Sequence, residues 1–179
     1  MMLEVKSSGH LLELLAQQLE GHWQGTGTVQ FPTMDTLSYR ESLSFVWDKE
    51  RHLLSYHQSA RLLARNEPSH AESGYLLIGP EEVLQWINTQ SSGRCEVLEC
   101  DDGLRDLRND EIEIVFQSNV IVNDPRMIRS QRRLCFDIDG TYLKYQQGMR
   151  TTTHDEFSNH LSARLERNNG DRIKFTAIS

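Results

Sequence analysis

Residues 37–63 read LSYRESLSFVWDKERHLLSYHQSARLL, and this stretch decides the fold class. Its first half alternates large apolar residues with polar ones, at Leu37, Tyr39, Leu43, Phe45 and Trp47. A period of two is typical of a β-strand that packs one face against a core. The polar turn Asp48-Lys49-Glu50 then sends the chain back into a second run of this kind. The stretch therefore predicts a long antiparallel hairpin.

Short apolar runs continue along the rest of the chain, at 74–78, 83–88, 94–99, 111–116, 132–138, 141–145, 161–166 and 172–178. Turn-forming pairs separate them, namely Gly79-Pro80, Ser92-Gly93, Asp102-Gly103, Asp139-Gly140 and Asn169-Gly170. About ten strands without helices between them favour a meander of hairpins over parallel βαβ units. Because closure removes exposed strand edges, we predict an all-β fold, an antiparallel up-and-down β-barrel, with a sandwich as the alternative.

One amphipathic segment precedes the strands. Residues 10–20 read HLLELLAQQLE, in which leucines recur at helical spacing as Leu11, Leu12, Leu15 and Leu19. Gly21 follows where a left-handed cap would end a helix. We therefore predict one short N-terminal helix within residues 1–20, whose apolar face plugs or flanks the barrel.

The length and composition of the chain indicate one globular domain. A chain of 179 residues with 37% hydrophobic and 25% charged residues is typical of a single folded core. We predict one barrel domain over residues 1–179, with residues 168–179 as a C-terminal extension. The net charge is −7 and the basic residues are scattered. Since nucleic-acid binding needs a dense basic surface, we expect no nucleic-acid partner.

The chain shows no targeting or membrane signal. No stretch resembles a signal peptide, and none approaches the roughly 18 apolar residues of a membrane span. We therefore expect a cytoplasmic protein with no membrane partner. The cysteines Cys95, Cys100 and Cys135 match neither a zinc-binding pair nor a disulfide scaffold, so we expect buried, reduced thiols.

The string CFDIDGTYLKY at residues 135–145 contains the acidic pair that opens phosphotransferases of the haloacid-dehalogenase type. That chemistry needs a lysine and further Mg²⁺-binding acids from later βα units, and residues 142–179 do not supply them. Asp139-Gly140 is also a strong hairpin signal, so we interpret the string as a turn. None of the seven histidines forms an i, i+4 helical pair with an acid between, so a zinc hydrolase has no support. Residue patterns alone leave the ligand of the barrel open.

Several motifs nevertheless occur in one order along the chain. They are GHWQGTG (21–27), FPT (31–33), HAESGY (70–75), QSSG (90–93), MRTTT (149–153) and HLSARL (160–165). In content and order they resemble the nitrobindin family, which consists of haem-binding β-barrels related in shape to lipocalins and fatty-acid-binding proteins. The resemblance runs nearly from end to end.

The resemblance implies a ferric haem b near the barrel mouth, with His160 of the H-L-x-A motif as its axial iron ligand. Thr33 corresponds to the second haem-contact position of the family, and we expect His70 and Met149 to line the pocket. The implied activity is the isomerisation of peroxynitrite to nitrate, together with binding of nitric oxide. No acid–base catalytic residue is predicted, and a homodimer is a further expectation.

The same motifs contain residues with structural interpretations. We expect Trp23 to pack on the leucine helix as a core plug, and Gly25 and Gly27 to allow a close backbone approach. Glu72 and Tyr75 are interpreted as a polar pair inside the barrel rather than as acid–base groups.

Three features keep alternatives open. Ser69 stands where methionine is common in the family, and Arg150 replaces a small residue, so a haem-free barrel carrying a fatty acid or another apolar ligand is the second hypothesis. Regular alternation would place His160 opposite the apolar face that carries Leu161 and Ala163. We therefore expect His160 at the first residue of its strand, where the register is not yet set.

The third hypothesis for the function is an interaction module that binds no small ligand.

Overall fold

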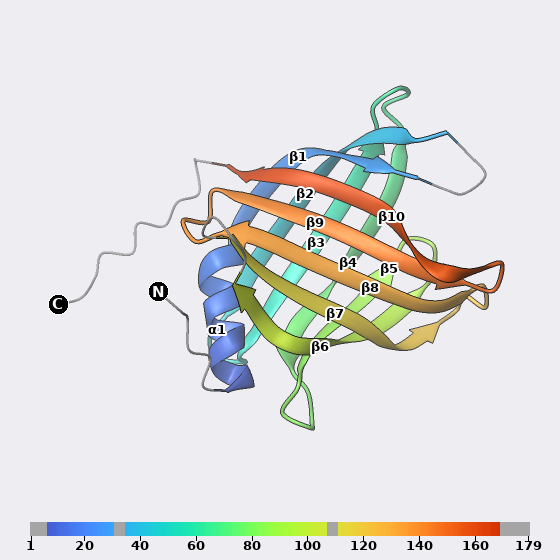
Figure 1. Ribbon diagram of the computed structural model, residues 1–179. Helices are drawn as coiled ribbons and strands as arrows, with labels where there is room; N and C mark the ends of the chain where they lie inside the picture. The colour runs from blue at the N-terminus through green and yellow to red at the C-terminus, as the bar shows by residue number, and fades with distance from the viewer. Residues whose placement is uncertain (1–6, 31–34, 107–110, 169–179) are drawn as a thin grey trace.

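A computed structural model of the protein describes residues 7–30, 35–106 and 111–168. Within these ranges the chain forms one helix and ten strands (Figure 1). Their bounds are α1 Ser8–Leu19, β1 Gly21–Val29, β2 Leu37–Asp48, β3 Leu53–Leu62, β4 Pro68–Ile78, β5 Leu84–Gln90, β6 Cys95–Asp106, β7 Glu111–Val122, β8 Met127–Asp137, β9 Tyr142–Thr151 and β10 His154–Arg167. The run predicted at 172–178 and the Asn169-Gly170 turn lie outside the described residues.

The strands form a closed antiparallel barrel. Each strand pairs with its neighbours in sequence, and β1 also pairs with β10, which closes the ring. Along each strand, alternate side chains enter the barrel, as the period of two predicts. Tyr39, Leu43 and Phe45 of β2 are buried in this way. The predicted up-and-down barrel is confirmed, and the sandwich alternative is excluded.

Helix α1 closes one end of the barrel. Ser7 caps its N-terminus by accepting a hydrogen bond from the backbone N–H of His10. The helix packs against β2 to β6, and Figure 1 shows it at one end of the strands. The apolar stripe predicted from the sequence is buried, at Leu11, Leu12, Leu15, Ala16 and Leu19. Among the described residues, no helix is long and apolar enough to span a membrane.

Trp23 fastens this helix to the start of β1. Its side chain is fully buried, and its indole N–H donates a hydrogen bond of 2.7 Å to the carbonyl oxygen of Leu19. The guanidinium of Arg167 lies 4.4 Å from the Trp23 ring centroid and donates to the carbonyl oxygen of Glu20. The carbonyl groups of Leu19 and Glu20, at the C-terminal end of α1, thereby have hydrogen-bond donors. The predicted role of Trp23 as a core plug is confirmed.

The contact between β1 and β10 requires glycine. A Cβ atom at Gly25 would lie 2.0 Å from the carbonyl oxygen of Arg164, and one at Gly27 would lie 2.4 Å from that of Ser162. Only a residue without a side chain allows the two backbones to approach this closely. The predicted close approach at both glycines is confirmed.

Two local predictions were wrong and one was confirmed. Asp102-Gly103 forms no turn but lies inside β6, where the pairing with β7 shifts register. Tyr75 is 47% exposed, because it stands an odd number of residues from Glu72 and therefore faces outward. Asp139-Gly140 does form a hairpin turn, with Gly140 at a positive φ of 61°.

Candidate functional site

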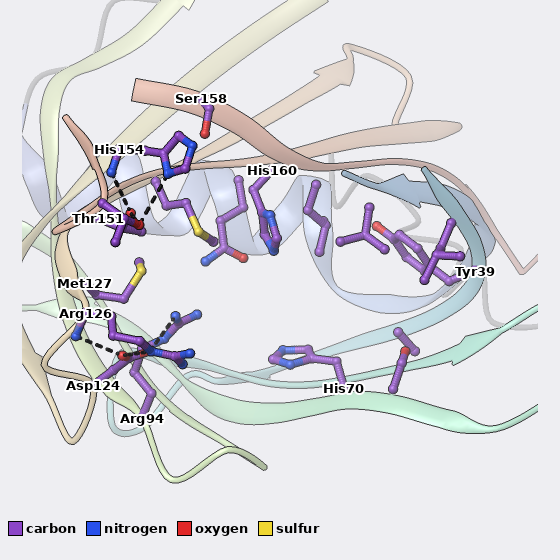
Figure 2. A pocket seen from close by; sticks show the side chains of 18 of the residues that line it. Tyr39, His70, Arg94, Asp124, Arg126, Met127, Thr151, His154, Ser158 and His160 are labelled. Atoms are coloured by element: carbon purple, nitrogen blue, oxygen red, sulfur yellow. Dashed lines mark hydrogen bonds and ion pairs between the residues drawn. The ribbon is translucent and has the colours of Figure 1, made fainter. Parts of the chain in front are cut away.

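A cavity of about 560 Å³ lies at the end of the barrel away from α1. Val29, Leu37, Leu62 and Ser69, which line it, lie at the ends of β1 to β4 that point away from the helix. One side of its wall is apolar and aromatic, with Val29, Leu37, Tyr39, Ala60 and Leu62. The other side is polar and includes Arg94, Asp124, Arg126, Thr151 and His154 (Figure 2).

His160 lines this cavity because β10 contains a β-bulge. Asn159 pairs with Gly148 and Leu161 pairs with the adjacent Gln147, so β10 contains one residue more than β9 at this point, namely His160. A bulge of this kind places consecutive side chains on the same face of the strand. His160 and Leu161 both line the cavity.

The expected position of His160 at the start of its strand was therefore wrong. β10 begins at His154, and His160 lies well inside it. Regular alternation would turn His160 away from the barrel interior, and the bulge turns it inward instead. Before it, Ser158 and His160 face the cavity, and after it Ala163 and Leu165 are buried.

The backbone fixes the tautomer of His160. Its Nδ1 atom lies 2.9 Å from the carbonyl oxygen of Gln30, and because a carbonyl can only accept, Nδ1 carries the proton. Burial lowers the pKa of His160, and the hydrogen bond to Gln30 opposes this only in part. A neutral ring with Nδ1–H carries its lone pair on Nε2, which is the state that a metal ion binds.

His70 lies on the facing wall of the cavity, as Figure 2 shows. It comes from β4, and its Nε2 atom lies 3.1 Å from Oε2 of Glu72. Met149 of β9 also lines the cavity, as does Ser69. The structure thus brings His160, His70 and Met149 to one cavity, while their contact with a cofactor stays a prediction.

The other predicted positions lie elsewhere. Thr33 lies outside the described residues. Arg150 does not line the cavity, because alternation along β9 turns its neighbours Met149 and Thr151 inward and Arg150 outward. Its Nε lies 3.6 Å from Asp155.

Sequence reasoning missed a buried ionic cluster below the cavity. Arg132 of β8 is completely buried and binds Glu72 of β4 through both carboxylate oxygens. It also donates a hydrogen bond of 2.9 Å to Glu96 of β6. Burial by itself would raise the pKa of Glu72, but the charge of Arg132 and the hydrogen bonds from His70 and Arg132 outweigh it and hold the pKa well below its usual value.

A sequence signal for this cluster did exist. Ser130, Arg132, Leu134 and Phe136 share one face of β8 by alternation, and all four are buried. An arginine in register with core residues requires buried acidic partners. Glu72, which the sequence analysis placed inside the barrel, is one of them, although it pairs with Tyr56 and Arg132 rather than with Tyr75.

Comparison with known proteins places this geometry in a family. Residues 13–167 match the family model described as THAP4-like, heme-binding beta-barrel domain. The chain belongs to this family. The match covers the second half of the helix, all ten strands of the described barrel and both histidine-bearing walls of the cavity. The resemblance to nitrobindins seen in the sequence is confirmed.

Individual members are distant relatives of this chain. A protein of Nocardia farcinica named peroxynitrite isomerase is 28% identical over 151 residues, which cover 83% of this chain and 86% of that protein. One from Arabidopsis thaliana with a similar name is 30% identical over 149 residues, covering 83% and 84%. The crystal structure of Rv2717c from M. tuberculosis superposes with a TM-score of 0.72 at 26% identity, covering 88% of this chain and 97% of that one.

The residues around the cavity fit the haem that the family name implies. A volume of about 560 Å³ lies within the range of roughly 300–1,000 Å³ typical of small-molecule sites. Haem is a flat, largely apolar ring with two carboxylates at one edge, and the cavity has an apolar side and a side bearing Arg94 and Arg126. His160 supplies an imidazole whose tautomer suits an iron ligand.

Proposed function

We propose that the chain binds ferric haem b in this cavity, with Nε2 of His160 as the axial ligand, and isomerises peroxynitrite to nitrate. The observation that carries the proposal is the β10 bulge, which turns His160 into the cavity and lets its Nδ1–H reach the carbonyl of Gln30. The names of the relatives support the activity. Nitric oxide, a neutral diatomic ligand of haem iron, is proposed as a second ligand.

The residues of the chain have definite tasks in this reaction. Bound haem supplies a Lewis-acidic iron at which an oxyanion binds and is polarised. His160 holds the group from one wall, and the Gln30 carbonyl keeps its ring in one orientation. The apolar wall around Leu37 and Leu62 excludes water from that side. Peroxynitrite and nitrate have the same atoms and charge, so the reaction needs no net proton transfer.

Haemin titration tests the proposal. Purified protein is expected to bind one haem with a shifted Soret band, and His160→Ala is expected to lose most of that affinity. His57→Ala is the matched control, because His57 is exposed on the outer face of β3. Stopped-flow spectroscopy of peroxynitrite decay then tests the activity of the loaded protein. An unshifted Soret band, or the same spectrum for His160→Ala, contradicts the assignment.

The alternative ligand, a fatty acid, cannot use Arg132 inside the barrel and would need Arg94 and Arg126, the cavity arginines that the proposed haem carboxylates also use. The carboxylate of a buried ligand needs a positively charged partner that is not already bound to another acid. Arg132, the fully buried cation of the described barrel interior, already binds Glu72 and Glu96. Native mass spectrometry that found a bound lipid and no uptake of haemin would favour this alternative.

A further inference from the structure

The wall that faces His160 carries a histidine and a carboxylate in direct contact. His70 Nε2 lies 3.1 Å from Glu72 Oε2, and the two side chains are 26% and 1% exposed. The imidazole therefore borders the cavity while the carboxylate lies behind it. An acid in this position orients the ring and decides which nitrogen carries the proton.

Glu72 is itself held rigidly. Arg132 binds both of its oxygens, and the Tyr56 hydroxyl donates a further hydrogen bond of 2.7 Å to Oε1. Glu96 occupies the remaining side of the guanidinium at 2.9 Å. Buried ionic clusters contribute little to stability compared with apolar side chains of similar volume. The cluster is therefore poorly explained by barrel stability, whereas it does fix the position of the carboxylate that binds His70.

The consequence is a pair of facing imidazoles with opposite tautomers. An ionised Glu72 can only accept, so Nε2 of His70 carries a proton and Nδ1 is the nitrogen left for a ligand. On the other wall, His160 carries its proton on Nδ1 and presents the lone pair of Nε2. The two rings thus leave different nitrogens for a ligand, Nε2 of His160 and Nδ1 of His70.

We propose that His70 contacts the small ligand bound on the haem face away from His160, and that Glu72 is a positioning residue that acts through His70. This inference rests on the proposed haem site. Nδ1 of His70 accepts a hydrogen bond from a protonated ligand atom and, when it takes up that proton, donates one to the anion. Arg132 holds Glu72 in place, and Glu96, the second carboxylate bound to Arg132, makes no contact with His70 among the described interactions.

Azide titration of the ferric, haem-loaded protein tests this assignment. His70→Leu is expected to weaken azide binding about tenfold, the effect of losing one charge-assisted hydrogen bond. Glu72→Gln keeps the shape of the side chain and is expected to weaken binding by about threefold or more. The double variant is expected to bind azide no more weakly than His70→Leu, because Glu72 acts only through the ring.

Glu96→Gln is the matched control. It also removes a buried carboxylate from Arg132 and is expected to lower the melting temperature as Glu72→Gln does, yet to leave azide affinity within about twofold of the unaltered protein. Equal azide effects for Glu96→Gln and Glu72→Gln, or an unchanged affinity for His70→Leu, overturn the inference.

A second measurement needs neither haem nor a variant. In the haem-free protein, ¹⁵N NMR is expected to show His70 as the Nε2–H tautomer, and an Nδ1–H tautomer overturns the positioning role of Glu72 even if Glu72→Gln fails to fold. A normal Soret band and an unchanged azide affinity in His70→Leu overturn this inference but leave the proposed function standing. The absence of any haem uptake overturns the proposed function, and this inference with it.

Discussion

The Nδ1 atom of His160 lies 2.9 Å from the carbonyl oxygen of Gln30, directly after the end of β1. Since a backbone carbonyl cannot donate, the ring is expected to be the Nδ1–H tautomer before any haem is added. Burial also lowers the pKa of His160, so the ring is expected to take up a second proton only below the usual pH for histidine. A ¹⁵N NMR pH titration of the haem-free protein measures both properties. A predominant Nε2–H form would contradict the proposed iron ligand.

Deletion of Asn159 tests the bulge separately from the histidine. Removing one residue is expected to restore regular pairing of β10 with β9, and His160 would then alternate with Leu161 and face outward. The loss of haem affinity is expected to match that of His160→Ala, although the histidine is retained. Ala163 and Leu165 keep their register, so near-UV circular dichroism is expected to stay native.

Asn159→Ala is the control for this deletion, because it keeps the bulge and is expected to keep haem affinity. A deletion protein that still shifts the Soret band in the same way would show that the bulge does not orient the ligand.

Glu41 makes stability depend on pH. Burial raises its pKa to about 7, although hydrogen bonds from Tyr39 and Gln58 oppose the shift. The usual value is 4.5, so between these two pH values the folded state holds a proton that the unfolded state has lost, and stability falls as the pH rises. Glutamine does not titrate, so Glu41→Gln lacks this loss. The free energy of unfolding of the variant minus that of the unaltered protein is expected to rise by up to about 3 kcal/mol between pH 4.5 and pH 8.

Urea unfolding at several pH values measures this difference. Glu50→Gln is the control for the loss of a carboxylate, because Glu50 is exposed in the turn after β2. A difference for Glu41→Gln that stays constant with pH would contradict the raised pKa of Glu41.

Trp23→Phe probes the closed end of the barrel. The variant loses the indole N–H that donates to Leu19 and leaves unfilled volume beneath α1, so it is expected to lower stability by about 2–3 kcal/mol. Haem affinity is expected to be unchanged, because the cavity lies at the other end. Chemical unfolding and haemin titration measure the two effects, and Trp47→Phe, at a half-buried position, is expected to destabilise less. Equal losses of stability in the two variants would contradict the anchoring role of Trp23.

Much of the fold could be predicted from local sequence patterns. The period of two in residues 37–63 gives the first hairpin, and the leucine spacing gives α1, because side-chain direction within a strand or helix depends only on neighbouring residues. Asp139-Gly140 gives a turn for the same reason. Asp102-Gly103 has the same local signal but lies inside β6, since pairing with β7 outweighs the turn preference there.

The candidate site was predictable only in part. The motifs predicted that His160, His70 and Met149 contact a cofactor, and the structure places all three at one cavity, but alternation placed His160 on the wrong face. The bulge that corrects this is a property of how β10 pairs with β9, and it has no signature within β10 alone. The hydrogen bond from His160 to Gln30 likewise joins residues 130 positions apart in sequence.

The sequence by itself determined the barrel, its plugging helix and the glycine contact at Gly25 and Gly27, because each follows from periodicity or from the absence of a side chain. Tertiary structure alone decided which nitrogen of each cavity histidine carries a proton. Glu72 reaches His70 within one strand, but its charge is maintained by Arg132, 60 residues away. Such partners meet only when the sheet closes on itself, and the low polarity of the closed interior makes their charges decisive.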